Sequence, residues 1–240
     1  MSLNYEELDF QKTPIGDLML RRRKMLQLGD FDIFEVKLGE DFLMTSLFHE
    51  SESQLSYIGL AQTDKKELDV IVGGLGLGYT ASAALEDPRV KSLVVVEYLP
   101  PVIRWHNEFL VPLGQSLTED PRCRFVQADF FACSKDVTKG FDPVYPSKKH
   151  DVILLDIDHT PTNHLNQTNK HFYTEQGLKE LSSHLNPGGV FALWSDGSPE
   201  EYFTDHLSKI FDQVKSHHIE FENPITCGMS EGTVYVGVRK

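Results

Sequence analysis

A series of short, almost wholly apolar segments, each followed by enough chain for a helix, constrains the fold of this protein more than any other feature of its sequence. The segments lie at residues 70–72, 93–96, 125–126, 152–155 and 190–194. Strands that are apolar on both faces and alternate with helices are typical of a parallel sheet covered by helices on both sides. Two further candidate strands, 216–221 and 233–239, are separated by too few residues for a crossover helix, so we expect them to pair antiparallel. The sequence therefore predicts an α/β fold with a seven-stranded sheet whose last strand is antiparallel.

Residues 13–48 show a different pattern, in which short apolar runs are separated by turn-forming residues. The runs begin after Gly16-Asp17, Gly29-Asp30 and Gly39-Glu40-Asp41. Short strands joined by such turns are typical of a small antiparallel meander. A helix capped by Ser51-Glu52-Ser53 is expected next. We therefore divide the chain into a small N-terminal β-meander at residues 1–49 and an α/β domain at residues 50–240.

Composition narrows the range of partners. The chain has 23 Lys and Arg residues against 36 Asp and Glu, which gives a formal net charge of −13. A surface of that charge repels nucleic acids and anionic membranes at long range and favours a cationic small molecule. The three cysteines, Cys123, Cys133 and Cys227, have no metal-ligand spacing and fit a reducing compartment, and no apolar run reaches the roughly 18 residues that a membrane span needs. With its polar N-terminus, the chain is expected to be cytoplasmic and to bind neither nucleic acid nor membrane; a homo-oligomer stays open.

A glycine-rich turn, Gly73-Gly74-Leu75-Gly76-Leu77-Gly78, follows the first buried strand and precedes a helix expected at residues 79–85. Glycines there let the backbone approach a ligand closely, and a helix N-terminus directs amide groups at it. Residues 76–81 fit the dinucleotide-binding pattern, whereas residues 74–78 fit the tighter alternation of folds that bind S-adenosylmethionine. Gly74, Gly76 and Gly78 are therefore candidate cofactor-binding residues for either class.

Acidic residues at the ends of the next two strands favour one of these classes. Glu97 lies about 20 residues beyond the glycines, where an acid would bind ribose hydroxyls in both classes. Asp129 ends the third strand and precedes Phe130, so a carboxylate is available for the exocyclic amine of adenine and an aromatic ring for its face. Dinucleotide folds do not generally need this acid, and an antiparallel last strand belongs to the S-adenosylmethionine class. The sequence therefore favours S-adenosylmethionine or a close relative.

Several segments together resemble the spermidine synthase family. They are residues 71–78, 95–97, 119–122, 127–131, 150–156 and 185–190. Spermidine synthases have a class I S-adenosylmethionine-dependent methyltransferase fold, Rossmann-like, and a small N-terminal β domain, so the resemblance covers nearly the whole chain. They use decarboxylated S-adenosylmethionine to move an aminopropyl group onto putrescine, without a metal. The resemblance implies a transferase of polyamine biosynthesis with the same nucleoside site.

Asp156 is the candidate catalytic residue. It ends the fourth strand, at the sheet edge where α/β proteins bind their ligands. An ammonium has no lone pair, so a carboxylate must bind and deprotonate it before it can attack beside a sulfonium. In the family an Asp at this place has that role, although Asp156 would also suit a simple cap of the strand end.

The chain departs from the family near the second substrate. Gly76 replaces the acid of the family's glycine turn, and the acids expected around Tyr57 are missing. The loop after Asp156 has Asp158 and His159 where the family has a Ser and a second Asp. Candidate substrate-binding residues are therefore Asp158, His159, Tyr57 and Trp194, of which Trp194 would equally fill the core.

Three alternatives stay open. Asp156, Asp158, His159 and His164 carry plausible metal ligands, but a loop of unknown path argues against a shared ion, and we expect no metal. Methyl transfer from S-adenosylmethionine to a small acceptor is an alternative activity to aminopropyl transfer. A protein of the same fold that binds a nucleoside without catalysis is a further interpretation. A methyltransferase must accept the carboxylate of the cofactor's amino-acid tail, which an aminopropyltransferase excludes.

Overall fold

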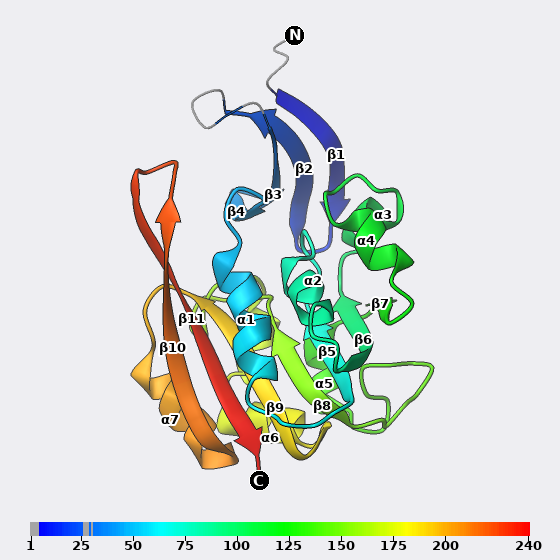
Figure 1. The fold of residues 1–240 in the computed structure, drawn as a ribbon, viewed down its shortest axis with the longest axis vertical. Coiled ribbons are helices and arrows are strands. Elements are labelled where there is room, and N and C mark those ends of the chain that lie inside the picture. The colour runs from blue at the N-terminus through cyan, green and yellow to red at the C-terminus, as the bar shows by residue number, and fades with distance from the viewer. Residues whose placement is uncertain (1–4, 26–28, 30) are drawn as a thin grey trace.

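The computed structural model describes residues 5–25, 29 and 31–240, and these form two sheets (Figure 1). The small sheet is antiparallel, with the order β1-β2-β3-β4. Its strands are β1 (Tyr5–Thr13), β2 (Gly16–Lys24), β3 (Asp32–Leu38) and β4 (Asp41–Thr45). The large sheet has seven strands in the order β10-β11-β9-β8-β5-β6-β7. They are β5 (Leu68–Gly73), β6 (Val90–Glu97), β7 (Cys123–Gln127), β8 (His150–Leu155), β9 (Leu185–Asp196), β10 (Phe211–Asn223) and β11 (Gly228–Arg239).

The strands β5 to β9 pair in parallel, while β11 runs antiparallel to both of its neighbours, β9 and β10. The predicted α/β fold with an antiparallel last strand is therefore confirmed. The physical reason is the one expected from the sequence: β10 and β11 are joined by a turn of four residues, which allows only an antiparallel pair.

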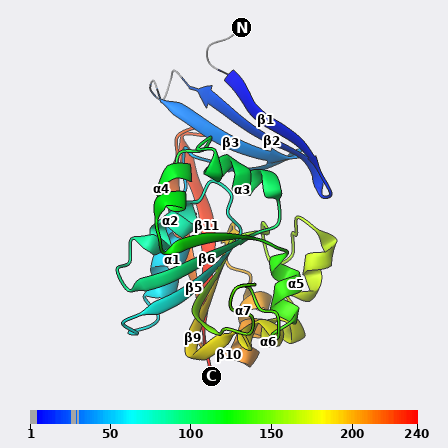
Figure 2. The same ribbon diagram turned by 90° about the vertical axis from the view of Figure 1, so that its right-hand side faces the viewer.

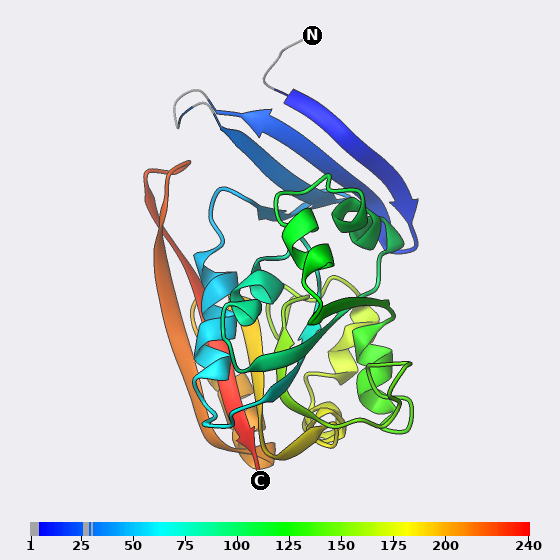
Figure 3. The same ribbon diagram turned by 45° about the vertical axis from the view of Figure 1, so that its right-hand side comes forward.

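Helices cover both faces of the large sheet (Figure 2). One face carries α1 (Glu50–Leu60) and α2 (Tyr79–Leu85), and the other carries α5 (Phe130–Lys135), α6 (Glu175–Ser182) and α7 (Glu201–Ile210). Between the small sheet and the β6–β7 end of the large sheet lie α3 (Pro100–Asn107) and α4 (Gly114–Glu119), as Figure 3 shows. A short 3-10 helix, η1 (Gln167–His171), follows β8. No helix in the described part of the chain is long and apolar enough to cross a membrane.

In the N-terminal part the structure adds one strand to the predicted meander and contradicts the predicted helix cap. The sequence did not predict β1, because this strand lies at the edge of the small sheet and mixes charged and apolar residues without a clear alternation. The helix α1 begins at Glu50 with His49 as its N-cap, so Ser51-Glu52-Ser53 lies inside the helix rather than capping it. The turn predicted at Gly29-Asp30 falls partly outside the described residues, as do residues 1–4. The division after residue 49 stays a prediction.

Asp9 of β1 ties the small sheet to α3. Its carboxylate accepts hydrogen bonds from the indole Nε1 of Trp105 at 2.6 Å and from Arg104 at 2.5 Å, and both donors lie on α3. Apolar side chains of β2 and β3 join the same core as α1, α2 and α3. The small sheet is therefore packed over the carboxyl ends of the parallel strands.

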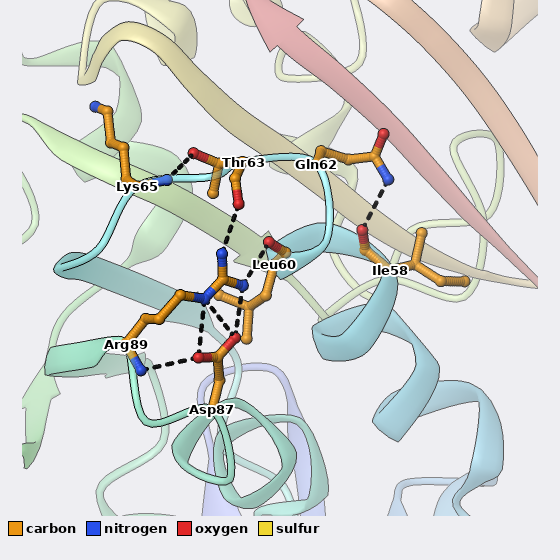
Figure 4. Close-up of polar contacts among 7 residues, drawn as sticks. All are labelled: Ile58, Leu60, Gln62, Thr63, Lys65, Asp87 and Arg89. Atoms are coloured by element: carbon orange, nitrogen blue, oxygen red, sulfur yellow. Dashed lines mark hydrogen bonds and ion pairs between the residues drawn. The ribbon is translucent and has the colours of Figure 1, made fainter.

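Arg89, which precedes β6, fixes the chain that leaves α1. Its guanidinium donates to the carbonyl oxygens of Leu60 at 3.0 Å and Thr63 at 2.6 Å, and it pairs with Asp87 (Figure 4). The last carbonyl groups of a helix have no partner within the helix, so the bond to Leu60 satisfies one of them. Arg89 thereby holds the C-terminal end of the helix whose other end reaches the candidate site.

Candidate active site

A cavity of about 650 Å³ lies over the carboxyl ends of β5, β6, β8 and β9. The glycine turn and the strand ends line it from the large sheet, and residues of β2, β3 and β4 line it from the small sheet. Ligands of α/β proteins bind at this edge, and the volume is in the range of small-molecule sites, roughly 300–1,000 Å³. We therefore take this cavity as the candidate active site.

The glycine turn has a conformation that only glycine adopts readily. Gly74 has φ of 94° and Gly76 has φ of 47°. A Cβ on Gly74 would collide with the backbone carbonyl oxygen of Asp156, and a Cβ on Gly76 would lie 2.5 Å from the thioether sulfur of Met44. Gly74 and Gly76 line the cavity, whereas Gly78 lies outside it as the residue before α2.

Glu97 lies in the cavity wall with its carboxylate held by the backbone. It is 8% exposed and accepts hydrogen bonds from the amides of Leu75 at 3.0 Å and Leu99 at 2.7 Å. Burial raises the pKa of Glu97, although these amides oppose the rise. Glu97 lines the cavity at a strand end beside the glycine turn, so the position suits a ribose.

Asp129 and Phe130 also line the cavity. One oxygen of Asp129, Oδ1, accepts from the amides of Phe131 and Ala132 at 2.9 and 3.1 Å and caps α5, while Oδ2 receives no hydrogen bond from the described residues. Phe130 is mainly a core residue, since it is buried and stacks on Phe141 with ring centroids 4.7 Å apart. Asp129 Oδ2 is therefore free to accept from an exocyclic amine.

Asp156 lines the same cavity at the end of β8. Its Oδ2 atom accepts a hydrogen bond from the Thr80 hydroxyl at 2.6 Å, and burial raises its pKa to about 6 despite this bond. A carboxyl group that titrates near neutrality is suited to accept a proton from an amine.

Glu52 is a second acid beside Asp156, and the sequence did not predict it as a site residue. It lines the cavity from the first turn of α1, and its Oε2 atom accepts from the Ser51 hydroxyl at 2.7 Å. Burial, and then repulsion by Asp156, raise the pKa of Glu52 to about 7. The sequence feature that could have indicated Glu52 is an acid in the first turn of the helix that follows the meander.

The predicted substrate-binding residues divide into two pairs. His159 and Trp194 line the cavity, and the buried indole Nε1 of Trp194 has no partner among the described residues. Tyr57 lies outside the cavity, is 42% exposed and donates to Glu86 at 2.7 Å. The structure therefore keeps His159 and Trp194 as candidates and places Tyr57 elsewhere, because the face of α1 that reaches the cavity carries Ser51 and Glu52.

Asp158 also lies outside the cavity. It is 2% exposed and accepts hydrogen bonds from the Leu165 amide at 2.7 Å, the Asn169 side chain at 2.9 Å and the Tyr173 hydroxyl at 2.8 Å. These bonds use its carboxylate to order the loop between β8 and α6. Asp158 therefore does not reach the cavity as the substrate-binding residue that the sequence predicted.

The formal charge of the cavity lining is negative. No Lys or Arg occurs among its described residues, and no group of three His, Cys, Asp or Glu side chains in the described ranges is placed to hold a metal ion. The carboxylates of the lining are Glu52, Glu97, Asp129, Asp156, Asp196 and Glu231. Such a lining attracts cations and repels anions.

Comparisons with known proteins agree with the fold and with the sequence motifs. No protein-family profile matches the chain. The polyamine aminopropyltransferase 2 of Pseudomonas aeruginosa is 29% identical over 182 residues, which are 72% of this chain and 46% of that protein. The polyamine aminopropyltransferase of Prochlorococcus marinus is 27% identical over 171 residues, 69% of this chain and 54% of the relative. The chain thus spans about half the length of these curated relatives.

Solved structures show the same fold. The spermidine synthase of Thermotoga maritima superposes with a TM-score of 0.70 at 18% identity, over 98% of this chain and 73% of that one. Human methyltransferase-like protein 13 in complex with SAH has a TM-score of 0.60 at 19% identity, over 79% of this chain and 82% of the other. The fold is that of the class I methyltransferases. Within this fold, the chain is similar in sequence to polyamine aminopropyltransferases and in structure to a spermidine synthase, which agrees with the resemblance of its motifs.

Proposed function

We propose that this protein is a transferase that binds decarboxylated S-adenosylmethionine and moves its aminopropyl group onto the nitrogen of an amine. The observation that carries the proposal is the carboxylate-lined cavity at the glycine turn, which has no Lys or Arg among its described lining residues. Both substrates of this reaction are cations, and the cavity has the opposite charge. The names of the curated relatives, polyamine aminopropyltransferases, support the same reaction.

In this proposal the nucleoside lies along the glycine turn. Gly74 and Gly76 give the turn its positive-φ backbone conformation, Glu97 binds the ribose hydroxyls and Asp129 Oδ2 accepts from the adenine amine. Phe130 contributes the edge of an aromatic ring to the adenine side. The observations that support these roles are the positions of Glu97 and Asp129 in the cavity wall and the Asp129 Oδ2 atom, which has no donor among the described residues.

Asp156 acts on the acceptor. An ammonium gives one proton to the Asp156 carboxylate, which frees the nitrogen lone pair. That lone pair forms the new N–C bond to the aminopropyl carbon while the C–S bond breaks and its electron pair goes to sulfur. The products are a secondary ammonium and methylthioadenosine, and charge is conserved because the sulfonium has lost its positive charge and the Asp156 carboxylate its negative charge. His159 and Trp194 are the proposed walls of the acceptor site.

Methyl transfer from S-adenosylmethionine is the second candidate. One observation favours it: Met44 covers Gly76, so the turn has no room for the acid that spermidine synthases carry there. Against it stands the absence of a Lys or Arg in the described lining that would pair with the carboxylate of the S-adenosylmethionine tail.

Calorimetric titration with S-adenosylmethionine, its decarboxylated form and methylthioadenosine tests the proposal. We expect the decarboxylated form to bind more tightly than S-adenosylmethionine, and methylthioadenosine to be released when an amine is added. Tighter binding of S-adenosylmethionine, with methyl transfer to an acceptor, would replace aminopropyl transfer by the second candidate. Binding of a nicotinamide dinucleotide but of none of these ligands would overturn the nucleoside assignment itself.

A further inference from the structure

We propose that Glu52 and Asp156 act as one carboxyl pair that shares a single proton and binds the reacting ammonium of the acceptor. Glu52 is then a second substrate-binding acid, contributed by α1. The inference rests on the proposed function, because it concerns the acceptor side of the same cavity.

The geometry joins the two acids through α2. The Thr80 hydroxyl donates to Asp156 Oδ2 at 2.6 Å and lies 3.4 Å from the backbone carbonyl oxygen of Glu52. The Ser51 hydroxyl fixes Glu52 Oε2 at 2.7 Å. Each carboxylate therefore has one oxygen held by a hydroxyl, and no side chain of the described residues donates to the other, Asp156 Oδ1 or Glu52 Oε1. Both residues line the cavity, so the two remaining oxygens are available to a ligand with N–H groups.

The surroundings of the pair favour retention of one proton. Burial raises the pKa of Asp156 to about 6, and burial together with repulsion by Asp156 raises that of Glu52 to about 7. Glu50 on α1 adds repulsion, and Tyr79 on α2 is neutral because burial raises its pKa to about 12. Other titratable groups of the cavity lining are Glu97, Tyr98, Asp129, His159, Asp196 and Glu231. Two interacting carboxyls lose their protons in two steps that belong to the pair, so one proton is kept near neutral pH.

A singly protonated pair has one negative charge, which matches one ammonium. When the acceptor ammonium gives up a proton, the pair takes it and becomes neutral, and the amine lone pair is free to form the N–C bond. The pair thus replaces acids that the chain lacks, since Ser53, Gln54 and Gly59 stand where the family has acidic residues around Tyr57. The substrate class is an amine whose attacking nitrogen is bound as a single ammonium between α1 and the end of β8.

The test compares Glu52→Gln with the matched control Glu50→Gln, which removes a charge from the same helix turn outside the cavity. The first readout needs no turnover: the titration of the Glu52 carboxyl followed by ¹³C NMR. In Asp156→Asn we expect the apparent pKa of Glu52 to fall by about one unit, because the like charge of Asp156 is removed. In Glu50→Gln it should fall by no more than a few tenths of a unit.

The second readout is transfer to an amine. We expect kcat/KM for the amine to fall about 10- to 100-fold in Glu52→Gln, and Glu52→Asp to restore part of it. Methylthioadenosine has no ammonium, so its dissociation constant should change by less than about twofold, which also shows that the variant is folded. An unchanged Glu52 titration in Asp156→Asn, or wild-type amine kinetics in Glu52→Gln, would overturn the pair. A shifted titration in a protein that transfers to no amine would instead overturn the proposed function and leave the pair standing.

Discussion

Met44 of the small sheet lies against Gly76 of the glycine turn. The Met44 thioether sulfur accepts a hydrogen bond from the Leu77 amide at 3.2 Å, and it would lie 2.5 Å from a Cβ on Gly76. The small sheet is therefore in direct contact with the backbone that is proposed to bind the nucleoside. This contact also explains why the chain carries glycine rather than an acid at this position.

Substitutions in the glycine turn should differ in severity. Gly74→Ala places a Cβ against the rigid backbone carbonyl of Asp156, whereas Gly76→Ala meets only the flexible side chain of Met44. We expect Gly74→Ala to weaken methylthioadenosine binding by at least about tenfold and Gly76→Ala by less, measured by calorimetry.

The control for backbone strain is Gly188→Ala, since Gly188 also has a positive φ, 71°, but no atom within 4 Å of an added Cβ. Its effect on binding should be negligible. Adding Met44→Ala to Gly76→Ala should recover binding if the collision is the cause; no recovery would refute that explanation.

Asp156→Asn should lower turnover about 10²- to 10⁴-fold while nucleoside binding persists, because the amide cannot accept a proton from the ammonium. Single-turnover release of methylthioadenosine measures the rate, and calorimetry measures the binding. Asp158→Asn is the contrasting variant: Asp158 lies outside the cavity and orders a loop, so its loss should lower the thermal unfolding temperature. Equal turnover of Asp156→Asn and the wild type would remove Asp156 from the mechanism.

Thr80→Val should change the pH dependence of the reaction. The Thr80 hydroxyl lowers the pKa of Asp156, which burial raises to about 6, so without this bond the pKa rises further. Asp156 must be unprotonated to accept a proton, and activity on the acid side should therefore be lost at a higher pH than in the wild type. The measurement is kcat/KM for the amine as a function of pH.

Thr118→Val serves as the control for that experiment, because Thr118 bonds only to carbonyl groups of α4 and lies outside the cavity. The pH below which kcat/KM falls should be the same in Thr118→Val as in the wild type. If the acid-side fall of kcat/KM in Thr80→Val moves to lower pH, or does not move, Asp156 is not the group whose protonation causes that fall.

Arg89→Ala should destabilise the fold by about 1–3 kcal/mol, because the carbonyl oxygens of Leu60 and Thr63 and the carboxylate of Asp87 lose a charged donor. Urea unfolding provides the measurement. Lys91→Ala removes a solvent-exposed pair with Glu67 and should change stability by less than about 1 kcal/mol. Comparable losses in the two variants would show that Arg89 contributes no more than a surface charge.

The sequence by itself determined the class of fold and the polar residues at the strand ends. Apolar strands alternating with helices allow little besides a covered parallel sheet, and parallel strands bring their carboxyl ends to one edge. For that reason the chain pattern alone assigns Glu97, Asp129 and Asp156 to one site, and all three line the cavity. The antiparallel last strand followed from the short connection between β10 and β11.

Only the tertiary structure decided which side chains of the helix and loops face the site. The rotation of α1 about its axis depends on how Leu55 and Leu60 pack in the core, and it places Glu52 in the cavity and Tyr57 outside. The path of the loop after β8 depends on Asn169 and Tyr173, which bond Asp158 away from the cavity. Such orientations result from contacts between residues far apart in the chain, so local pattern and motif spacing do not contain them.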